Sequence, residues 1–127
     1  MHKLCICQSG KQYSKCCEPF LTGQKHAKTP VQLMRSRYSA FALGGYGDYL
    51  LATWAPMYRS GLRSSDLSVK TTDWVGLEVI NKSQSNNSAT VEFKAKYIQE
   101  GETLEHHEKS LFERVDGQWF YLVGEFD

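Results

Sequence analysis

The sequence predicts an α+β fold in which one curved antiparallel sheet wraps a long helix. Apolar residues recur with helical spacing in the first half of the chain, and from Trp74 onward they alternate with polar residues at the period of a strand. Helices followed by a run of strands joined by tight turns are typical of an α+β domain. All four cysteines lie between residues 5 and 17, so they form a separate local device ahead of this domain.

The first element we expect is a cysteine loop over residues 1–19. The segment from Gln8 to Lys11 has the composition of a turn, and residues 12–15 are expected to begin a short helix that leads into Cys16 and Cys17. The segment has almost no apolar residues to bury, so a metal ion or contact with the main domain must order it. Residues 20–28 are expected to be a connector.

A long amphipathic helix is expected next. Thr29 is a favourable N-cap residue and Pro30 suits the first helical position. An apolar stripe follows at spacings of three and four residues, and Gly44-Gly45 ends the helix. The stripe consists of Val31, Met34, Tyr38 and Phe41.

Two shorter helical pieces are expected before the sheet. The first runs from about Asp48, interpreted as its N-cap, through Trp54, and Ala55-Pro56 ends it. Residues 57–73 are mixed and polar, with a helical turn expected near Asp66.

Four strands are expected in the second half of the chain. Leu77 and Val79 lie on one face of the first strand, and the polar run 82–88 is expected to turn the chain. Alternation is cleanest over residues 89–97. Turns are expected at residues 100–102 and at Asp116-Gly117, a strong hairpin signal that precedes the last strand.

Composition and charge exclude several classes of protein. A chain of 127 residues suits one domain, and 41% hydrophobic residues exclude disorder for most of its length. A net charge of +1 gives no global field that would attract nucleic acid or an acidic membrane. No stretch approaches the roughly 20 apolar residues of a membrane span, and the first residues have no signal-peptide core. We therefore expect a cytoplasmic protein.

The four cysteines are expected to bind a metal. Cys5 and Cys7 are too close in sequence for an ordinary disulfide, as are the adjacent Cys16 and Cys17, and cytosolic thiols stay reduced. Four thiolates form a closed tetrahedral zinc site with bonds of about 2.3 Å and no open position for a catalytic water. Iron is the main competing metal. Free or redox-active thiols are the alternative to a metal.

The cysteine pattern also carries a family resemblance. Cys5-x-Cys7-x8-Cys16-Cys17, with Ser9-Gly10-Lys11 and Tyr13 inside it, resembles the SEC-C motif found at the C-terminus of SecA. The whole chain resembles the YchJ family, which joins this motif to a domain of the nuclear-transport-factor-2-like fold. The matching blocks are residues 29–41, 48–54, 91–97, 107–112 and 117–121.

This resemblance implies a zinc-binding SEC-C motif over residues 1–19 and a cone-shaped nuclear-transport-factor-2-like domain over residues 28–127. The SecA motif recognises partner proteins, so a protein partner is expected through this module. Ile6 and Gln8 stand where the motif usually has Pro and Gly, so a residue with a side chain must make the turn after Cys7. Many relatives carry a second SEC-C motif at the C-terminus, whereas this sequence, which ends at Asp127, contains only the motif near its start.

The interior of the cone is the second candidate site. His106, Glu108 and Ser110 share one face of the third strand with Phe112, which should point inward. An inward Glu108 needs a partner, because a buried unpaired carboxylate is costly. Arginines on the flanks of the helix stripe are the expected partners. The candidate pocket or pairing residues are Arg35, Arg37, Tyr38 and Trp54.

Two interpretations of this face stay open. In one, Glu108, helped by His106 or His107, transfers protons in a lyase or isomerase reaction. In the other, an Arg–Glu pair only ties the helix to the sheet. The leading prediction is a non-enzymatic binding protein, with a protein partner at the SEC-C module and a small ligand in the cone; nucleic acid and membrane are not expected partners. An open pocket above roughly 300 Å³ with Glu108 or His106 unpaired would favour the enzyme.

Overall fold

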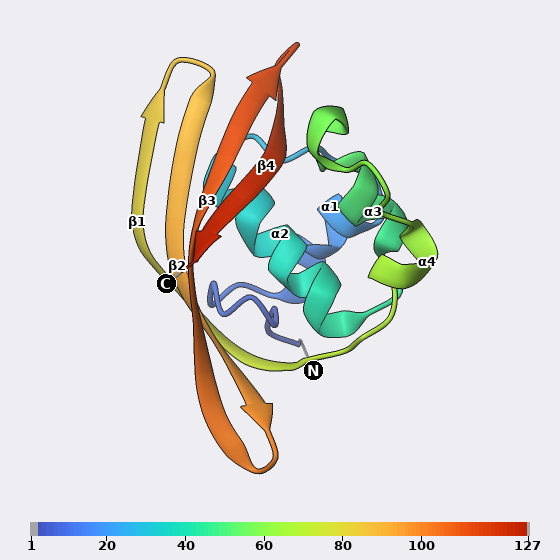
Figure 1. Cartoon of the computed structure of the whole chain (residues 1–127), viewed down its shortest axis with the longest axis vertical. Coiled ribbons are helices and arrows are strands. Elements are labelled where there is room, and N and C mark those ends of the chain that lie inside the picture. The colour runs from blue at the N-terminus through green and yellow to red at the C-terminus, as the bar shows by residue number, and fades with distance from the viewer. Residues whose placement is uncertain (1–2, 127) are drawn as a thin grey trace.

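A four-stranded antiparallel sheet curves around one long helix in the computed structural model, which describes residues 3–126 (Figure 1). The strands follow one another in the order β1-β2-β3-β4, a simple meander. No helix within the described residues is both long and apolar enough to span a membrane. The elements are the 3₁₀ helices η1 (Tyr13–Lys15) and η2 (Pro56–Tyr58), the helices α1 (Glu18–Leu21), α2 (Pro30–Leu43), α3 (Gly47–Ala52) and α4 (Ser64–Leu67), and the strands β1 (Asp73–Ser85), β2 (Ser88–Gln99), β3 (Glu102–Val115) and β4 (Gln118–Phe126).

Helix α2 begins and ends where the sequence predicts. The Thr29 side chain accepts a hydrogen bond from the Gln32 amide at 3.1 Å, and Pro30 occupies the first turn. Gly44 closes the helix with φ 76°, a left-handed conformation that glycine adopts without a steric penalty.

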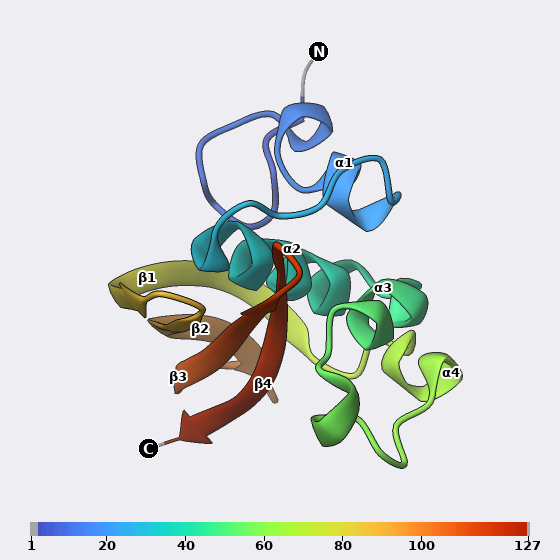
Figure 2. The same ribbon diagram turned by 90° about the horizontal axis from the view of Figure 1, so that it is seen from above.

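The helix lies between two layers. Figure 2 shows the cysteine loop, residues 3–17, on one side of α2 and the sheet on the other. Residues on both sides of α2 are consequently buried, including the polar Ser36, Arg37 and Ser39. A helix that is covered on both sides must satisfy its polar side chains within the protein.

The sheet bends at irregularities in its pairing. Register shifts occur between Trp74 and Gly76 and between Val79 and Asn81 in the β1–β2 ladder, and at Leu111 in the β3–β4 ladder. Such bulges increase local twist and bend the strand that carries them. The resulting curvature leaves space between α2 and the concave face of the sheet.

The hairpin turns confirm two predictions and correct a third. Glu100-Gly101 and Asp116-Gly117 each have two consecutive positive φ angles, as tight two-residue hairpins require. The polar run 82–88 is not a turn as a whole: β1 continues to Ser85 and the chain reverses at residues 86–87. The end of β1, residues 80–85, is exposed on both faces, so this strand carries no alternating apolar signal there.

The short helices also differ from prediction. Glu18 and Pro19 begin α1 instead of ending the cysteine loop, because a proline fits the first turn of a helix. Asp48 is not an N-cap: Tyr46 holds that position, and the Asp48 carboxylate accepts a hydrogen bond from the Ser64 hydroxyl. The helical turn expected near residue 66 is confirmed as α4.

Helix α3 ends at Ala52, two residues before its predicted end, because the following residues pair with β4. The Tyr121 amide donates to the Thr53 carbonyl, and the Ala55 amide donates to the Tyr121 carbonyl, both at 2.8 Å. This short parallel bridge places Trp54 against Tyr121, with ring centroids 5.2 Å apart. The end of α3 is thereby fixed to the edge of the sheet.

Candidate metal centre and internal pocket

The four cysteine sulfurs form one cluster. All four Sγ atoms lie within 4.8 Å of one another, with 3.6 Å between Cys7 and Cys16 and 4.0 Å between Cys16 and Cys17. None is in a disulfide. Tetrahedral bonds of about 2.3 Å would place sulfurs about 3.8 Å apart, so the spacing fits a single four-coordinate ion. The cluster can therefore hold a metal.

The backbone of the cysteine loop brings these thiols together. The Cys5 amide donates to the Lys11 carbonyl at 2.8 Å, and the Gln8 amide donates to the Cys5 carbonyl at 3.1 Å. The tip between these bonds contains Gly10 in a left-handed conformation. Cys5, Cys7 and Cys17 are buried, whereas Cys16 is partly exposed.

Hydrogen bonds among the thiols make the cluster electrostatically uneven. Donation from Cys17 and Cys5 lowers the pKa of Cys7 well below its ordinary value, and the pKa of Cys17 rises in return. Burial raises the pKa of Cys16 to about 11, although the Ser9 hydroxyl hydrogen-bonds its sulfur at 3.1 Å. Packing four thiols this closely places negative charge beside negative charge, which a divalent cation would neutralise.

Gln8 makes the turn after Cys7 in an unusual way. Its φ is 62°, a left-handed conformation that is unfavourable for a residue with a side chain. The side-chain amide compensates by pairing with the edge of β1: it donates to the Val75 carbonyl at 3.2 Å and accepts from the Leu77 amide at 3.3 Å. Gln8 thus connects the cysteine loop to the sheet.

The side chain of Arg35, on α2, contacts the cysteine loop and does not line the pocket. Its Nη1 donates to the Cys7 carbonyl at 2.6 Å, and Ser39, one turn further along α2, lies 3.9 Å from the Cys5 sulfur through its hydroxyl. Arg35 is therefore not a partner of Glu108, one of the two possibilities that the sequence suggested. Its hydrogen bond to the Cys7 carbonyl helps to hold the cysteine loop on α2.

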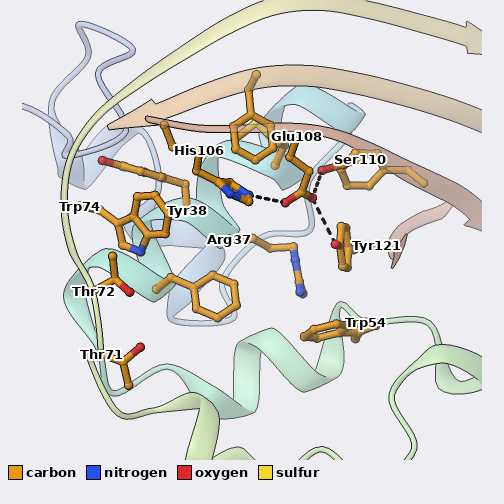
Figure 3. A pocket seen from close by; sticks show the side chains of 15 residues that line it. Arg37, Tyr38, Trp54, Thr71, Thr72, Trp74, His106, Glu108, Ser110 and Tyr121 are labelled. Carbon is orange, nitrogen blue, oxygen red and sulfur yellow. Dashed lines mark hydrogen bonds and ion pairs between the residues drawn. The ribbon is translucent and has the colours of Figure 1, made fainter. Parts of the chain in front are cut away.

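An open pocket of 330 Å³ lies between α2 and the concave face of the sheet (Figure 3). His106, Glu108, Ser110 and Phe112 all line it, which confirms that this face of β3 points inward. The predicted pocket residues Arg37, Tyr38 and Trp54 line it as well. Trp74 and Phe93 add aromatic walls from β1 and β2.

Glu108 has three partners in the pocket, and none is an arginine. His106 Nε2 lies 3.0 Å from Oε1, while Ser110 and Tyr121 donate to Oε2 at 2.6 and 3.2 Å. The predicted Arg–Glu pair is wrong, because within the described residues Arg37 donates elsewhere, to the Leu50 carbonyl and the Thr53 hydroxyl. Glu108 is 8% exposed, and these donors satisfy the requirement of a buried carboxylate.

Gly124 provides the space that Glu108 occupies. It lies opposite Ser110 in the β3–β4 register, and a Cβ at this position would overlap the Glu108 carboxylate. The contact of Tyr121 with Glu108 and the space provided by Gly124 do not follow from any local sequence pattern. Both residues lie on β4, and they reach Glu108 only because of the register in which β4 pairs with β3.

His107 lies apart from the pocket. Its Nε2 is 2.6 Å from a Glu92 oxygen, across the β2–β3 ladder on the opposite side of the sheet from His106. Successive residues of a strand point to opposite faces, so only one of the two neighbouring histidines can face the cone. Of the candidate acid–base residues, His106 and Glu108 are together and His107 is not.

A second hollow lies beside the cysteine loop. This basic groove has a volume of 890 Å³ and is formed by the cysteine loop, the connector and the start of α2. No carboxylate of the described residues lines it. Its cationic side chains are Lys11, Lys15, Lys25, Lys28 and Arg35.

Comparison with known families agrees with this two-part organisation. Residues 3–19 match the SEC-C motif, and residues 29–124 match the family described as "YchJ, middle NTF2-like domain". A UPF0225 protein of Serratia proteamaculans (strain 568) is 40% identical over 130 residues, covering 98% of this chain and 84% of the relative. The UPF0225 protein YchJ of Shigella dysenteriae serotype 1 (strain Sd197) is 38% identical with the same coverage.

Solved structures show the same fold. The solution structure of a SEC-C motif containing protein from Rhodopseudomonas palustris has a TM-score of 0.86 and 36% identity, covering 95% of this chain and 96% of the other. The crystal structure of a SEC-C motif containing protein from Psychrobacter arcticus has a TM-score of 0.83 and 32% identity, covering 94% and 80%. The α+β prediction, with a SEC-C motif ahead of a nuclear-transport-factor-2-like domain, is confirmed.

The two hydrogen bonds between the Gln8 side chain and the backbone of β1 lead to a prediction. Gln8→Ala should lower the free energy of unfolding by about 1 kcal/mol, because it removes two partly exposed hydrogen bonds and keeps the unfavourable φ. Gln8→Gly should be less damaging, because glycine relieves the backbone strain. Urea unfolding measures the difference, and amide hydrogen exchange at Leu77 should accelerate in both variants.

Gln24→Ala is the matched control, since Gln24 is exposed and its side chain makes no hydrogen bond within the described residues. A Gln8→Gly protein that is less stable than Gln8→Ala would contradict the strain argument. An unchanged rate of amide hydrogen exchange at Leu77 would contradict the hydrogen bond between its amide and the Gln8 side chain.

Proposed function

Because this chain belongs to the YchJ family, which joins a SEC-C motif to a nuclear-transport-factor-2-like domain, we propose that it is a zinc-stabilised binding protein of the cytoplasm. The cone domain holds a small ligand, and the SEC-C module contacts a protein partner. The observation that carries the proposal is the open pocket, in which the carboxylate of Glu108 already has three donors.

The pairing of Glu108 favours binding over catalysis. A general base needs a free acceptor that can reach a substrate proton. Here Oε2 accepts from both Ser110 and Tyr121, and Oε1 contacts His106. A cavity of 330 Å³ lies at the lower end of the range of about 300–1,000 Å³ for small-molecule sites, so the ligand is small.

Zinc is the metal that best suits the cysteine cluster. Four thiolates around one ion form a closed site, which is the arrangement of structural zinc. Iron also accepts four thiolates, and metal analysis separates the two. The metal would hold the cysteine loop together, and the chemistry of any ligand would take place elsewhere.

The metal proposal predicts the behaviour of Cys16→Ser. Zinc bound per chain should fall from about one toward zero, because a hydroxyl is a poor substitute for a thiolate ligand, while the cone domain still unfolds cooperatively. Elemental analysis and thermal unfolding measure the two properties. Ser14→Ala, an exposed change in the same loop, should keep its zinc. Zinc that is unchanged in Cys16→Ser, or absent from freshly purified reduced wild type, would contradict the assignment.

The basic groove supports a protein partner with an acidic segment. Its five cations face one hollow without a carboxylate among the described residues, and opposite charge across an interface favours association. Capture experiments with two variants test this partner. A protein captured by wild type should not be captured by Cys16→Ser, and Lys15→Glu should bind it more weakly. Equal capture by all three proteins would count against recruitment through the module.

The pocket proposal predicts which tryptophans sense a ligand. Trp54 and Trp74 line the pocket, whereas Trp119 is buried outside it. In NMR titrations with small aromatic compounds, the indole N–H signals of Trp54 and Trp74 should shift and that of Trp119 should stay in place. Thr72→Phe, at a lining position, should weaken binding at least several-fold, and Thr103→Phe, at an exposed position outside the lining, should not. Equal shifts of all three indoles would contradict a specific site.

One observation favours a second function, that of a lyase or isomerase. His106 Nε2 lies 3.0 Å from Glu108 inside the open pocket, and the other ring nitrogen has no hydrogen-bond partner among the described residues. An imidazole oriented by a carboxylate is a general arrangement for proton transfer. In this version His106 moves the proton and Glu108 orients it, the reverse of the roles that the sequence suggested.

The enzyme alternative predicts proton abstraction from a carbon acid. Deuterium uptake from solvent by phenylacetone or phenylpyruvate, followed by NMR, should be at least about tenfold faster with wild type than with His106→Gln. Gly124→Ala, which displaces Glu108 without removing it, should slow uptake as well. His107→Gln, on the opposite face of the sheet, is the control. Equal rates of deuterium uptake in all four proteins would contradict the enzyme alternative and leave binding as the remaining proposal.

A further inference from the structure

Arg37 is a buried cation with no carboxylate partner. It is 5% exposed, and within residues 3–126 no aspartate or glutamate forms an ion pair with it. Burial lowers its pKa to about 10, so the guanidinium remains charged at neutral pH. Buried charges in proteins are ordinarily paired, because an isolated charge in a poorly solvated site is costly. The missing partner needs an explanation.

The environment of the guanidinium compensates only part of this charge. Its carbon lies 4.7 Å from the Trp54 ring centroid and 4.5 Å from that of Tyr121, so aromatic rings flank the group. Nη1 donates to the Leu50 carbonyl at 2.8 Å and to the Thr53 hydroxyl at 2.7 Å. All of these partners are neutral.

One edge of the guanidinium is left open. Nε and Nη2 have no hydrogen-bond partner among the described residues. These two nitrogens are neighbours on one side of the planar group. Together they can donate two parallel hydrogen bonds to one carboxylate or phosphate. Arg37 lines the pocket, so a ligand there lies beside a guanidinium that has two uncommitted donor nitrogens.

Glu108 does not take that place. Its two oxygens are occupied by His106, Ser110 and Tyr121, and Figure 3 shows the head of Arg37 between Glu108 and Trp54 without a contact to the carboxylate. Tyr121 donates to Glu108 through its hydroxyl while its ring lies beside Arg37, so one side chain separates the two charges. Glu108 therefore lowers the energy of the cation only from a distance.

Aromatic side chains form much of the remaining wall of the pocket. Trp74 packs edge-to-face on Tyr38 and on His106, with ring centroids 6.2 and 5.9 Å apart. Phe93 and Phe112 close the side formed by the sheet. Aromatic walls favour an apolar, planar body through burial and edge or stacking contacts. The small volume limits such a body to about one or two rings.

We infer that the ligand of the cone is a small organic anion with a flat apolar body, and that Arg37 pairs with its negative group through Nε and Nη2. The inference rests on the proposed small-ligand function and specifies the chemical class of the ligand. The anion supplies the partner that the buried cation lacks, and the aromatic walls cover the rest of the molecule.

Matched ligands test this in the wild-type protein. Benzoate, phenylacetate and indole-3-acetate are each titrated beside their primary amides, and phenethylamine provides a cation with a similar body. Each carboxylate should bind at least about tenfold more tightly than its amide, because hydrogen bonds to charged groups are the stronger ones. The NMR signal of the Arg37 Nε–H group should shift with the carboxylates and much less with the amides.

Substitutions of Arg37 separate charge from shape. Arg37→Gln should reduce the carboxylate-to-amide ratio to about one, whereas Arg37→Lys should keep a preference for the anion because it keeps the charge. Arg63→Gln, at an exposed position far along the chain, controls for net charge and should leave the ratio unchanged. If Arg37→Gln fails to fold, the wild-type ratios and the Arg37 signal still decide the matter.

The outcomes distinguish this inference from the function on which it rests. If amides bind as tightly as carboxylates while the Trp54 and Trp74 signals shift, the anion inference is overturned and the small-ligand function stands. If the carboxylates shift only signals of the basic groove, the inference is likewise overturned. If no member of the panel shifts Trp54, Trp74 or Arg37, both the inference and the small-ligand function fail.

Discussion

Burial of helix α2 on both of its sides is the constraint on which the rest of the structure depends. One side carries Arg35 and Ser39, which contact the cysteine loop, and the other carries Arg37 and Tyr38, which face the cone. Because most of the helix is covered, its buried charged groups depend on partners in other parts of the chain. Arg35 and Arg37 both donate to neutral groups, Arg35 to a backbone carbonyl of the cysteine loop. Of the two, Arg37 is the buried one and Arg35 is partly exposed.

This arrangement gives the two parts of the protein different roles. The four cysteine sulfurs lie within 4.8 Å of one another, so the cluster suits a four-coordinate structural ion with no open position for a reaction. The cone contains an open pocket that is lined by both polar and aromatic side chains. The cysteine loop contacts two elements that form walls of that pocket. It contacts α2 through Arg35 and β1 through the side chain of Gln8. A change in the structure of the cysteine loop is therefore expected to alter the pocket as well.

The pairing of Glu108 illustrates where sequence reasoning stops. Alternation along β3 was enough to predict that Glu108 points inward, because strand residues two apart share a face. Its partner was predicted to be an arginine on charge alone. The actual donors are Ser110, two residues away on the same face, and Tyr121, which the β3–β4 register brings alongside Phe112. A register shift at Leu111 sets that alignment, and no local pattern reveals it.

Local spacing was enough to predict the cap and end of α2, two of the three hairpin turns, the inward face of β3 and the grouping of four cysteines in one short loop. The tertiary structure decided which of two arginines faces the cone. Residues 35 and 37 differ by about 200° around a helix, so one must meet the cysteine loop and the other the sheet. Which is which depends on how α2 is rotated between its two layers, and that rotation is set by packing from both sides at once.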